Sequence, residues 1–340
     1  MRGPVDSGAA SVVAERLLRL LREPVHLGSD RITPSASVGI AIREDGDTVE
    51  ELLSFADTAM YQAKARGRDQ WVCFDHLMRE SASDQLRTES ALRQAIDNGQ
   101  LEVHYQPEFH LETGDVVGAE ALMRWRHPER GLKAASSFVS LAEQSGLIID
   151  HGRWALGQAT AQAARWVAEG CDIITRVNVS ARQFRGALVG EVQEALAAAN
   201  LSAGRLCLEF AETTIMDDAE ESVQLLEQLN DLGVKIGIDG FGTGFSSLAY
   251  LKRLRLDTLK MDRTIVAGVG VDSENTAIVR SIIGLAQSLD LELVAEGIET
   301  DAELAEVVQL GCHRGQGFQL GHPVPAEDFG LLLGAADSLE

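Results

Sequence analysis

The sequence predicts an α/β fold, a (β/α)8 barrel of the TIM type preceded by a small α+β segment. From about residue 101 onward, short runs rich in Val, Ile and Leu alternate with longer stretches that carry apolar residues at helical spacing. This alternation continues for about 240 residues, close to the usual length of eight strand-and-helix units closed into one barrel. A doubly wound open sheet is the alternative that the alternation alone allows.

Eight strand-like runs and the helical stretches between them make up the predicted barrel. The expected strands are residues 102–105, 116–121, 174–179, 205–210, 234–238, 258–261, 292–295 and 315–319. The expected helices include residues 154–168, 190–199, 222–232, 275–289 and 302–310. Barrels of this type carry their chemistry at the C-terminal ends of the strands, and nearly every polar motif of this chain falls at such an end.

The residues before the barrel show another pattern. Residues 15–75 are expected to run helix, strand, strand, helix, strand, with an apolar strand at 36–41 and an amphipathic helix at 56–64. A polar helix is expected to link this segment to the barrel. The predicted boundaries are residues 1–75, 76–98 and 99–335.

Composition limits the partners of this chain. Its 340 residues carry 30 Lys and Arg against 52 Asp and Glu, a formal net charge of −22, of which residues 1–80 hold only −3. This charge opposes nonspecific binding to DNA, RNA or an anionic membrane. If so acidic a protein handles an anionic ligand, it needs cations at its site, which points to a divalent metal.

Cysteine spacing and hydropathy indicate the cellular setting. The cysteines form no Cys-x-x-Cys pair, so neither a zinc knuckle nor a disulfide framework is expected. No apolar run approaches the roughly 18 residues that a membrane span needs, and the N-terminus lacks the apolar core of a signal peptide. We therefore expect a soluble protein in the cytoplasm.

Oxygen-bearing side chains lie at the ends of four of the predicted strands and suggest a metal site. Glu120, Asn178, Glu209 and Asp239 form an oxygen-only set, which suits Mg²⁺ or Mn²⁺ and suits zinc poorly. Taken alone, a carboxylate at a strand end is more often solvated or a helix cap, and Asn178 could cap the helix that follows it. Because separate strands would have to place these groups on one rim by chance, a shared metal site is the preferred interpretation.

The order of the motifs resembles one known family. The motifs are Glu120-Ala121-Leu122-Met123-Arg124, Asn178-Val179-Ser180, Glu209-Phe210-Ala211-Glu212, Asp239-Gly240-Phe241-Gly242-Thr243-Gly244, Lys260-Met261-Asp262, Glu296-Gly297-Ile298-Glu299 and Gln316-Gly317-Phe318. Together they closely resemble the active site of EAL-domain phosphodiesterases, which hydrolyse the bacterial messenger cyclic di-GMP. The resemblance covers roughly residues 86–330.

The resemblance implies a site for one or two ions of Mg²⁺ or Mn²⁺. The first ion would be bound by Glu120, Asn178, Glu209 and Asp239. The second would share Asp239 and be held by Glu296 and by a second aspartate, at the position where this chain has Gly240. Without that carboxylate we expect weaker metal binding before any loss of fold, although a further glycine in this glycine-rich loop is also explained by turn geometry.

The resemblance also implies roles for the remaining site residues. It gives catalytic roles to Lys260, Glu120 and Glu296, substrate contacts to Arg124, Gln316, Gln106 and Asp262, and supporting roles to Glu212 and Glu299. Lys260 would position or polarise the attacking water, and Arg124 could fork onto a phosphate oxygen. The ordinary alternatives are a surface lysine paired with Asp262 and a salt bridge at the rim.

The first segment resembles part of a second family. Residues 36–41, 56–64 and Gly67-Arg68-Asp69 resemble the C-terminal part of a GGDEF domain, the diguanylate cyclase module often found upstream of EAL. The Gly-Gly-Asp/Glu-Glu-Phe signature and the elements before it are absent, so no cyclase activity is expected. A truncated start and a vestigial domain both remain open, and an incomplete sheet would leave an edge strand unpaired.

Two functions of different classes follow from the resemblance. The first is metal-dependent hydrolysis of cyclic di-GMP to linear pGpG, weakened or lost through Gly240. The second is a catalytically inactive receptor that binds cyclic di-GMP or a protein partner. The enzyme is favoured by the retained Glu120, Glu209, Lys260, Glu296 and Gln316, and the receptor is favoured by Gly240. A homodimer through the barrel is also expected, formed by the loop 239–247 and the helix that begins near Ser246, and an upstream sensor or GGDEF region is a further expected partner.

Overall fold

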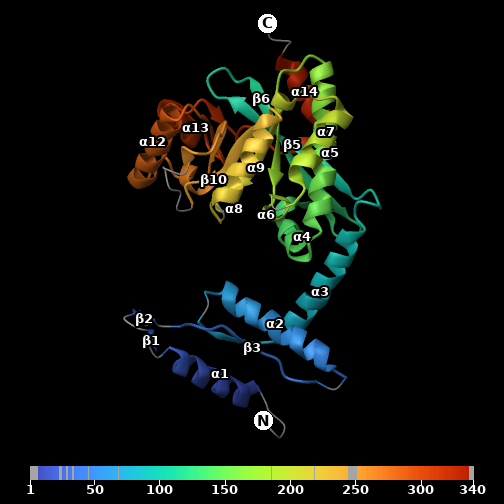
Figure 1. Ribbon diagram of the computed structural model, residues 1–340, viewed down its shortest axis with the longest axis vertical. Helices are drawn as coiled ribbons and strands as arrows, with labels where there is room; N and C mark the ends of the chain where they lie inside the picture. The colour runs from blue at the N-terminus through green and yellow to red at the C-terminus, as the bar shows by residue number, and fades with distance from the viewer. Residues whose placement is uncertain are drawn as a thin grey trace. The chain divides into compact units, whose positions relative to one another are not determined.

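The computed structural model describes residues 7–336, apart from residues 23–24, 28–29, 33, 45, 68, 185, 218 and 244–250. The chain divides into two compact units, Met1–Ala91 and Leu92–Glu340. Figure 1 shows both units, and each is described here by itself.

The first unit contains short strands and long helices. Its elements are α1 (Ser7–Leu21), β1 (Val25–Leu27), β2 (Asp30–Ile32), β3 (Val38–Ile40), α2 (Val49–Ala65), β4 (Trp71–Cys73) and most of α3 (His76–Arg93). β1 and β2 pair antiparallel, while β3 and β4 pair parallel. Three strands therefore precede α2 where the sequence predicted two. α2 begins at a capping box, in which the Thr48 hydroxyl accepts from the backbone of Glu51.

In the described part of the second unit, eight strands close into one barrel. They are β5 (Leu101–His110), β6 (Val116–His127), β8 (Ile174–Val179), β9 (Leu206–Ala211), β10 (Lys235–Phe241), β11 (Thr258–Met261), β12 (Glu292–Ala295) and β13 (Arg314–Gly315). The sheet runs from β6 through β8 to β13 and then β5, and the pairing of β5 with β6 closes it. The predicted barrel is confirmed.

One strand of the barrel runs against the others. The strands from β6 through β8 to β13 pair parallel, whereas β5 pairs antiparallel with both β6 and β13. A short turn joins β5 to β6 and contains Gly114 at φ +79°, a connection that suits antiparallel neighbours because parallel neighbours need a crossover. β5 therefore contributes to the site from its middle. Two short strands, β7 (Gly131–Ala134) and β14 (Val324–Pro325), extend the sheet beside β6 and β5.

Helices follow the strands and cover them with apolar side chains. They are α4 (Val139–Ser145), α5 (Ile148–Ala168), α6 (Ala181–Phe184), α7 (Leu188–Ala199), α8 (Glu212–Asp217), α9 (Ala219–Asp231), α11 (Arg263–Val266), α12 (Ser273–Ser288), α13 (Asp301–Gln309) and α14 (Ala326–Ala336). The main core contains Val177, Leu208, Ile238 and Leu259 from the strands. No helix in the described residues combines the length and the hydrophobicity of a membrane span.

The last predicted strand is wrong in length. Only Arg314–Gly315 pairs as a strand, where residues 315–319 were expected. Beyond it the backbone turns, because the carbonyl of Gln316 accepts from Ile298 and the amide of Gln319 donates to the Ile298 carbonyl. This turn holds Gln316 against the loop that follows β12.

Candidate active site at one end of the barrel

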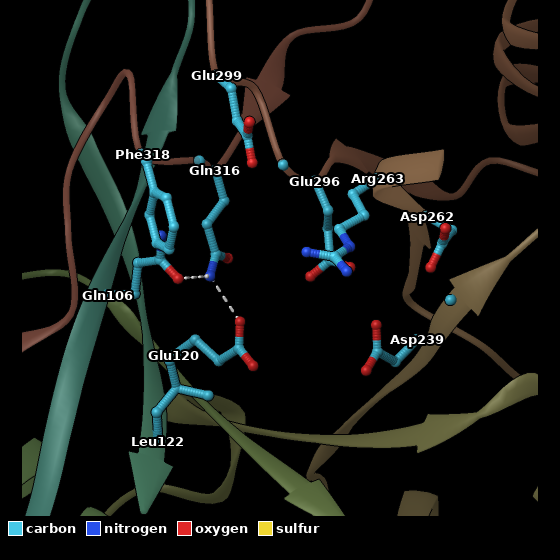
Figure 2. A pocket seen from close by; sticks show the side chains of 13 residues that line it. Gln106, Glu120, Leu122, Asp239, Asp262, Arg263, Glu296, Glu299, Gln316 and Phe318 are labelled. Carbon is cyan, nitrogen blue, oxygen red and sulfur yellow. Dashed lines mark hydrogen bonds between the residues drawn. The ribbon is translucent and has the colours of Figure 1, made fainter. Parts of the chain in front are cut away.

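A cavity of about 300 Å³ opens where the predicted motifs meet (Figure 2). Its lining residues are Gln106, Glu120, Leu122, Asp239, Gly240, Asp262, Arg263, Glu296, Gly297, Glu299, Gln316, Gly317 and Phe318. They come from the middle of β5 and β6, from the end of β10, and from the residues that follow β11, β12 and β13. The barrel thus brings together groups that lie more than two hundred residues apart along the chain, as in the contact between Gln316 and Gln106.

Lys260 lies beneath the cavity, at the centre of the charged groups. Its side chain is fully buried, and its Nζ lies 2.9 Å from Glu120 Oε2, 3.0 Å from Glu209 Oε2 and 2.6 Å from Glu296 Oε1. Burial of an ammonium without partners would be costly, so these three carboxylates are what hold the charge there. The alternative of a surface lysine paired with Asp262 is not what the structure contains.

The three carboxyls respond differently to the same environment. Burial raises the pKa of Glu209 to about 7, with Lys260 acting against the shift. Burial also raises the pKa of Glu296 well above its usual value. For Glu120 burial acts in the same direction, but Lys260 and the hydrogen bonds from Gln316 and Asn178 outweigh it and lower the pKa. Glu120 is therefore the carboxylate most firmly held as an anion.

Amide side chains fix Glu120 from two sides. Gln316 Nε2 donates to Glu120 Oε2 at 2.6 Å and to Gln106 Oε1 at 2.9 Å, as Figure 2 shows. On the other side, Asn178 Nδ2 donates to Glu120 Oε1 at 2.6 Å. Gln316 is 4% exposed, and its buried Oε1 has no hydrogen-bond partner among the described residues. The site therefore has an acceptor available for a bound molecule.

Gly240 also lines the cavity and follows Asp239 on β10. Figure 2 shows Asp239 and Asp262 across the cavity from Gln106 and Gln316. The φ of Gly240, +69°, is in the left-handed region, and a Cβ built there would meet only Asp262 Oδ2, at 3.9 Å. Asp262 uses its other oxygen, Oδ1, to accept from the Thr264 backbone at 2.7 Å and so caps α11. Space for a side chain at position 240 is therefore present.

The loop after β10 is held by Glu212. Its Oε2 accepts from the Gly242 amide at 3.0 Å, the contact expected of a residue that supports this loop. Residues 244–250 lie outside the described part of the chain, and the predicted dimer-forming element near Ser246 lies there too.

The donor set fits a hard divalent cation. Glu209 Oε1 is buried without a hydrogen bond among the described residues, and Asp239 and Asn178 together line a second cavity of about 550 Å³ next to the first. Carboxylate and amide oxygens are the ligands that Mg²⁺ and Mn²⁺ prefer. Across the residues described, no three His, Cys, Asp or Glu side chains converge on one point as metal ligands. The Lys260 ammonium stands between the three glutamates instead, so an ion would have to share them with it.

Two predicted residues lie apart from the centre. Arg124 is not among the residues that line the cavity. Its Nη1 donates to the carbonyl of the preceding residue, Met123, at 2.9 Å. Glu299 lines the cavity but is exposed, and its amide donates to Glu303 Oε2 at 3.0 Å. Their predicted substrate and supporting roles stay predictions.

Sequence reasoning missed two kinds of residue. Arg263 and Phe318 line the cavity, and each directly follows a predicted motif residue or lies inside a motif. Arg176 and Glu108 lie buried in the barrel below the site. Their signal was present, because each is a charged residue two positions from a predicted site residue on the same apolar strand.

Two family models match the chain. The EAL domain matches residues 89–323, and the diguanylate cyclase GGDEF domain matches residues 5–70. Among curated proteins, the bifunctional diguanylate cyclase/cyclic di-GMP phosphodiesterase MucR of Pseudomonas aeruginosa is 44% identical over 329 residues, which are 96% of this chain and 48% of MucR. The cyclic di-GMP phosphodiesterase NbdA of the same organism is 40% identical over 319 residues, 93% of this chain and 41% of NbdA. The chain thus spans about half the length of the curated relatives it matches.

Solved structures with the same fold include two with bound nucleotide. The PaMucR phosphodiesterase in complex with c-di-GMP has 45% sequence identity and a TM-score of 0.70, covering 72% of this chain and 99% of that chain. The EAL enzyme Bd1971 in its cAMP- and cyclic-di-GMP-bound form has 31% identity and a TM-score of 0.71, covering 85% of this chain and 77% of that chain.

Proposed function

The chain belongs to the EAL-domain family, and from this premise we propose that it hydrolyses one phosphodiester bond of cyclic di-GMP to give linear pGpG in a reaction that depends on Mg²⁺ or Mn²⁺. The observation that carries the proposal is the convergence of Lys260 on Glu120, Glu209 and Glu296 below a cavity. Relatives that bear the name of cyclic di-GMP phosphodiesterase support the choice of substrate. We assign this activity to residues 99–335 and no cyclase activity to residues 1–75.

The donor groups of the site support a metal-dependent mechanism. A bound divalent cation supplies a Lewis acid that polarises a phosphoryl oxygen and makes a water molecule more acidic. Glu120, Asn178, Glu209 and Asp239 would hold one ion, and Asp239 with Glu296 a second. Because Gln316 and Asn178 both donate to Glu120, its carboxylate keeps one orientation while substrate enters.

Cationic and acceptor groups of the chain would act on the substrate itself. Lys260 keeps a positive charge, since the surrounding carboxylates raise its pKa well above the usual value although burial acts to lower it. That charge would stabilise the negative charge that develops on the phosphate oxygens when water attacks the phosphorus atom. Arg263 lines the cavity as a second cation. Gln316 Oε1, which has no hydrogen-bond partner among the described residues, would accept a hydrogen bond from an N–H or O–H group of the nucleotide.

A receptor is the second candidate, and Gly240 is the observation that favours it. With no carboxylate at position 240, the second ion would have Asp239 and Glu296 as its protein ligands. In that case the chain would bind cyclic di-GMP and signal without cutting it. We also propose a cytoplasmic setting, where a nucleotide messenger is available, a homodimer through the barrel, and an upstream sensor or GGDEF region as partner.

Turnover of cyclic di-GMP by the purified chain decides between the two candidates. Formation of pGpG is followed by chromatography with Mg²⁺, with Mn²⁺ and with chelator, and binding is measured by calorimetry in parallel. Product that disappears with chelator supports the phosphodiesterase. Binding without product supports the receptor. The absence of both binding and product contradicts hydrolysis and nucleotide binding alike, and leaves a receptor for a protein partner.

A further inference from the structure

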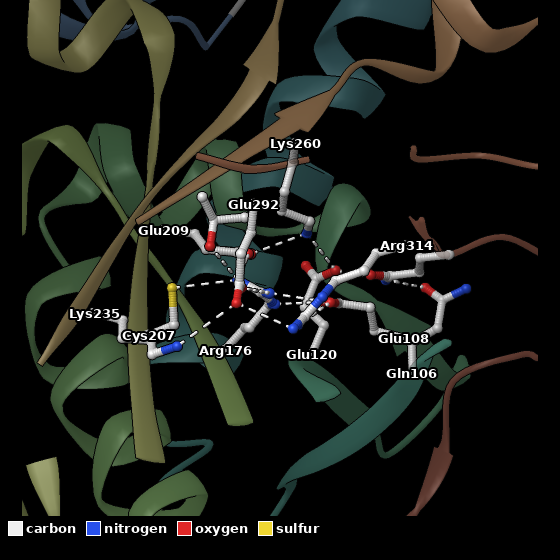
Figure 3. A network of polar contacts seen from close by, with 12 residues as sticks. Gln106, Glu108, Glu120, Arg176, Cys207, Glu209, Lys235, Lys260, Glu292 and Arg314 are labelled. Atoms are coloured by element: carbon white, nitrogen blue, oxygen red, sulfur yellow. Dashed lines mark hydrogen bonds and ion pairs between the residues drawn. The ribbon is translucent and has the colours of Figure 1, made fainter. Parts of the chain in front are cut away.

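The barrel interior below the cavity is charged, where barrels of this type usually pack branched apolar side chains. Figure 3 shows these groups, which we call the interior ion network: Glu108 from β5, Arg176 from β8, Glu209 from β9, Glu292 from β12 and Arg314 from β13. Arg176 and Glu108 are both 0% exposed. Such groups are costly to bury and need a full set of partners.

Arg176 has those partners and connects the network to the site. Its Nε and Nη2 both donate to Glu108, with Nη2 3.1 Å from Oε1. Its Nη1 donates to Thr258 Oγ1 at 3.2 Å and to Cys207 Sγ at 3.4 Å, and the same nitrogen lies 3.5 Å from Glu209 Oε1. The guanidinium is therefore held by groups from β5, β9 and β11 while it faces a predicted metal ligand.

Glu209 lies between two cations. Its Oε2 is 3.0 Å from Lys260 Nζ, and its Oε1 faces Arg176 Nη1. Oε1 forms no hydrogen bond within the described residues. Attraction to Lys260 and to Arg176 therefore sets the orientation of the carboxylate plane. The Arg176 guanidinium is planar and is itself held in place by its hydrogen bonds.

The backbone leaves room for this arrangement. A Cβ at Gly118 would meet Glu108 Oε2 at 3.2 Å, and a Cβ at Gly237 would meet Glu209 Cγ at 3.3 Å and Cys207 Sγ at 3.5 Å. Any larger residue at these two positions would press on Glu108 or Glu209. The glycines therefore clear the space that the paired side chains fill.

We propose that Arg176 is a positioning residue that acts through Glu209, holding its carboxylate in the orientation in which it binds a divalent cation. The inference rests on the proposed metal-dependent function. Groups that orient metal ligands are typically worth about 10- to 100-fold in metal affinity. Arg314, by contrast, contacts Glu108 Oε1 at 3.2 Å and Glu292 Oε1 at 3.0 Å. Arg314 thus belongs to the same network as Arg176, but among the described residues it forms its ion pairs with Glu108 and Glu292 and not with Glu209.

The test compares Arg176→Gln with Arg314→Gln as the matched control. Mn²⁺ affinity is measured by calorimetry on the full chain, together with thermal unfolding in chelator. We expect Arg176→Gln to lose about 10- to 100-fold in Mn²⁺ affinity, whereas Arg314→Gln lowers the unfolding temperature but leaves Mn²⁺ affinity unchanged. If Arg176→Gln does not fold, Arg176→Lys is used instead, because it keeps the positive charge but lacks the planar guanidinium. Its Mn²⁺ affinity is expected to be lower than that of the wild type without being lost.

Several results would overturn the assignment. Equal loss of Mn²⁺ affinity in Arg176→Gln and Arg314→Gln would mean that the network acts only through stability. Unchanged Mn²⁺ affinity in a folded Arg176→Gln or Arg176→Lys, with wild type still binding Mn²⁺ and forming pGpG, would remove the positioning role and leave the proposed function intact. A wild-type chain that neither binds Mn²⁺ nor forms pGpG would instead contradict the proposed function, and the inference with it.

Discussion

At the scale of single residues, Gly240 has the clearest consequence for function. Its φ of +69° disfavours most side chains, but Asp and Asn enter the left-handed region more readily than other residues. The open space around its Cβ position means that the cost of a substitution is one of backbone conformation and not of packing. A carboxylate at this position would belong to the lining of the cavity, with Asp262 Oδ2 as the atom nearest to its Cβ.

We predict that Gly240→Asp tightens Mn²⁺ binding and raises turnover of cyclic di-GMP. A carboxylate that binds the second ion directly should change Mn²⁺ affinity by more than a group that only orients a ligand. We therefore expect an increase of at least about tenfold in Mn²⁺ affinity. Calorimetry and pGpG formation are the measurements. Gly240→Ala also places a Cβ at this left-handed position, but without a carboxylate, and serves as control. Equal behaviour of the two variants would contradict our account of the second ion.

A second residue-scale prediction concerns pH. Because burial raises the pKa of Glu209 to about 7 from 4.5, the metal-free native chain holds a proton there that the unfolded chain has already released. Stability without metal should therefore fall as pH rises from about 4.5 through about 7. Mn²⁺ must displace that proton, so its affinity should rise between about pH 6 and pH 8.

Calorimetry in buffers of different ionisation enthalpy would measure the released proton directly. Glu209→Gln has no proton to release at this position, so it should weaken the pH dependence of the Mn²⁺ binding that remains, and Glu296, whose pKa burial also raises, should account for the rest. Affinity that is independent of pH in the wild-type chain would show that Glu209 is already ionised in the metal-free state.

At the scale of elements, the reversed direction of β5 places Glu108 in the barrel interior. On the parallel strands, the interior partner precedes the site residue by two positions, as Arg176 precedes Asn178. On β5 it follows, so Glu108 comes two residues after Gln106. Reversal thus lets one strand supply a cavity residue and an ion-network residue while it is joined to β6 by a short turn.

The glycine on β10 provides the element-scale prediction. Gly237→Ala should lower both the unfolding temperature and the Mn²⁺ affinity, because its Cβ would lie 3.3 Å from Glu209 Cγ and must displace that side chain. Gly157→Ala, in α5, is the control, since nothing lies within 4 Å of its Cβ. That change should stabilise the helix by up to about 1 kcal/mol. Full retention of Mn²⁺ affinity by Gly237→Ala would argue that Glu209 has room to move.

At the scale of the whole molecule, the net charge of −22 sets the long-range field that an anionic nucleotide meets. The site cations Lys260 and Arg176 are buried among carboxylates and contribute little to that field at a distance. Cyclic di-GMP should therefore be repelled as it approaches, and only the local cations and bound metal should retain it.

We predict that salt does not slow association of cyclic di-GMP with the Mn²⁺-saturated chain. Between about 0.1 M and about 1 M NaCl the Debye length shortens from roughly 10 Å to roughly 3 Å, which screens the repulsion. Stopped-flow association rates with a fluorescent cyclic di-GMP analogue would measure this. Nonspecific effects of salt on the fluorescence signal are controlled by the same titration with chelator present. A rate that falls steeply with salt would reveal a positive steering surface that the net charge conceals.

The sequence by itself determined the barrel and the chemistry of its rim. Strands such as 174–179, 258–261 and 292–295 were predicted to the residue, because a short apolar run is a local signal. The ends of these runs indicated that Glu120, Asp239, Glu296 and Gln316 lie at one end of the barrel, and in the structure they line one cavity.

Only the tertiary structure decided which charges meet. Lys260 and Glu120 are 140 residues apart, and their contact depends on how the barrel closes and on the register of each strand. The direction of β5, the burial that raises the pKa of Glu209, and the pairing of Arg176 with Glu108 follow from that closure. The period of two along a strand predicts which face of the sheet a side chain lies on. Which side chains meet across the barrel depends on how all of its strands pack together.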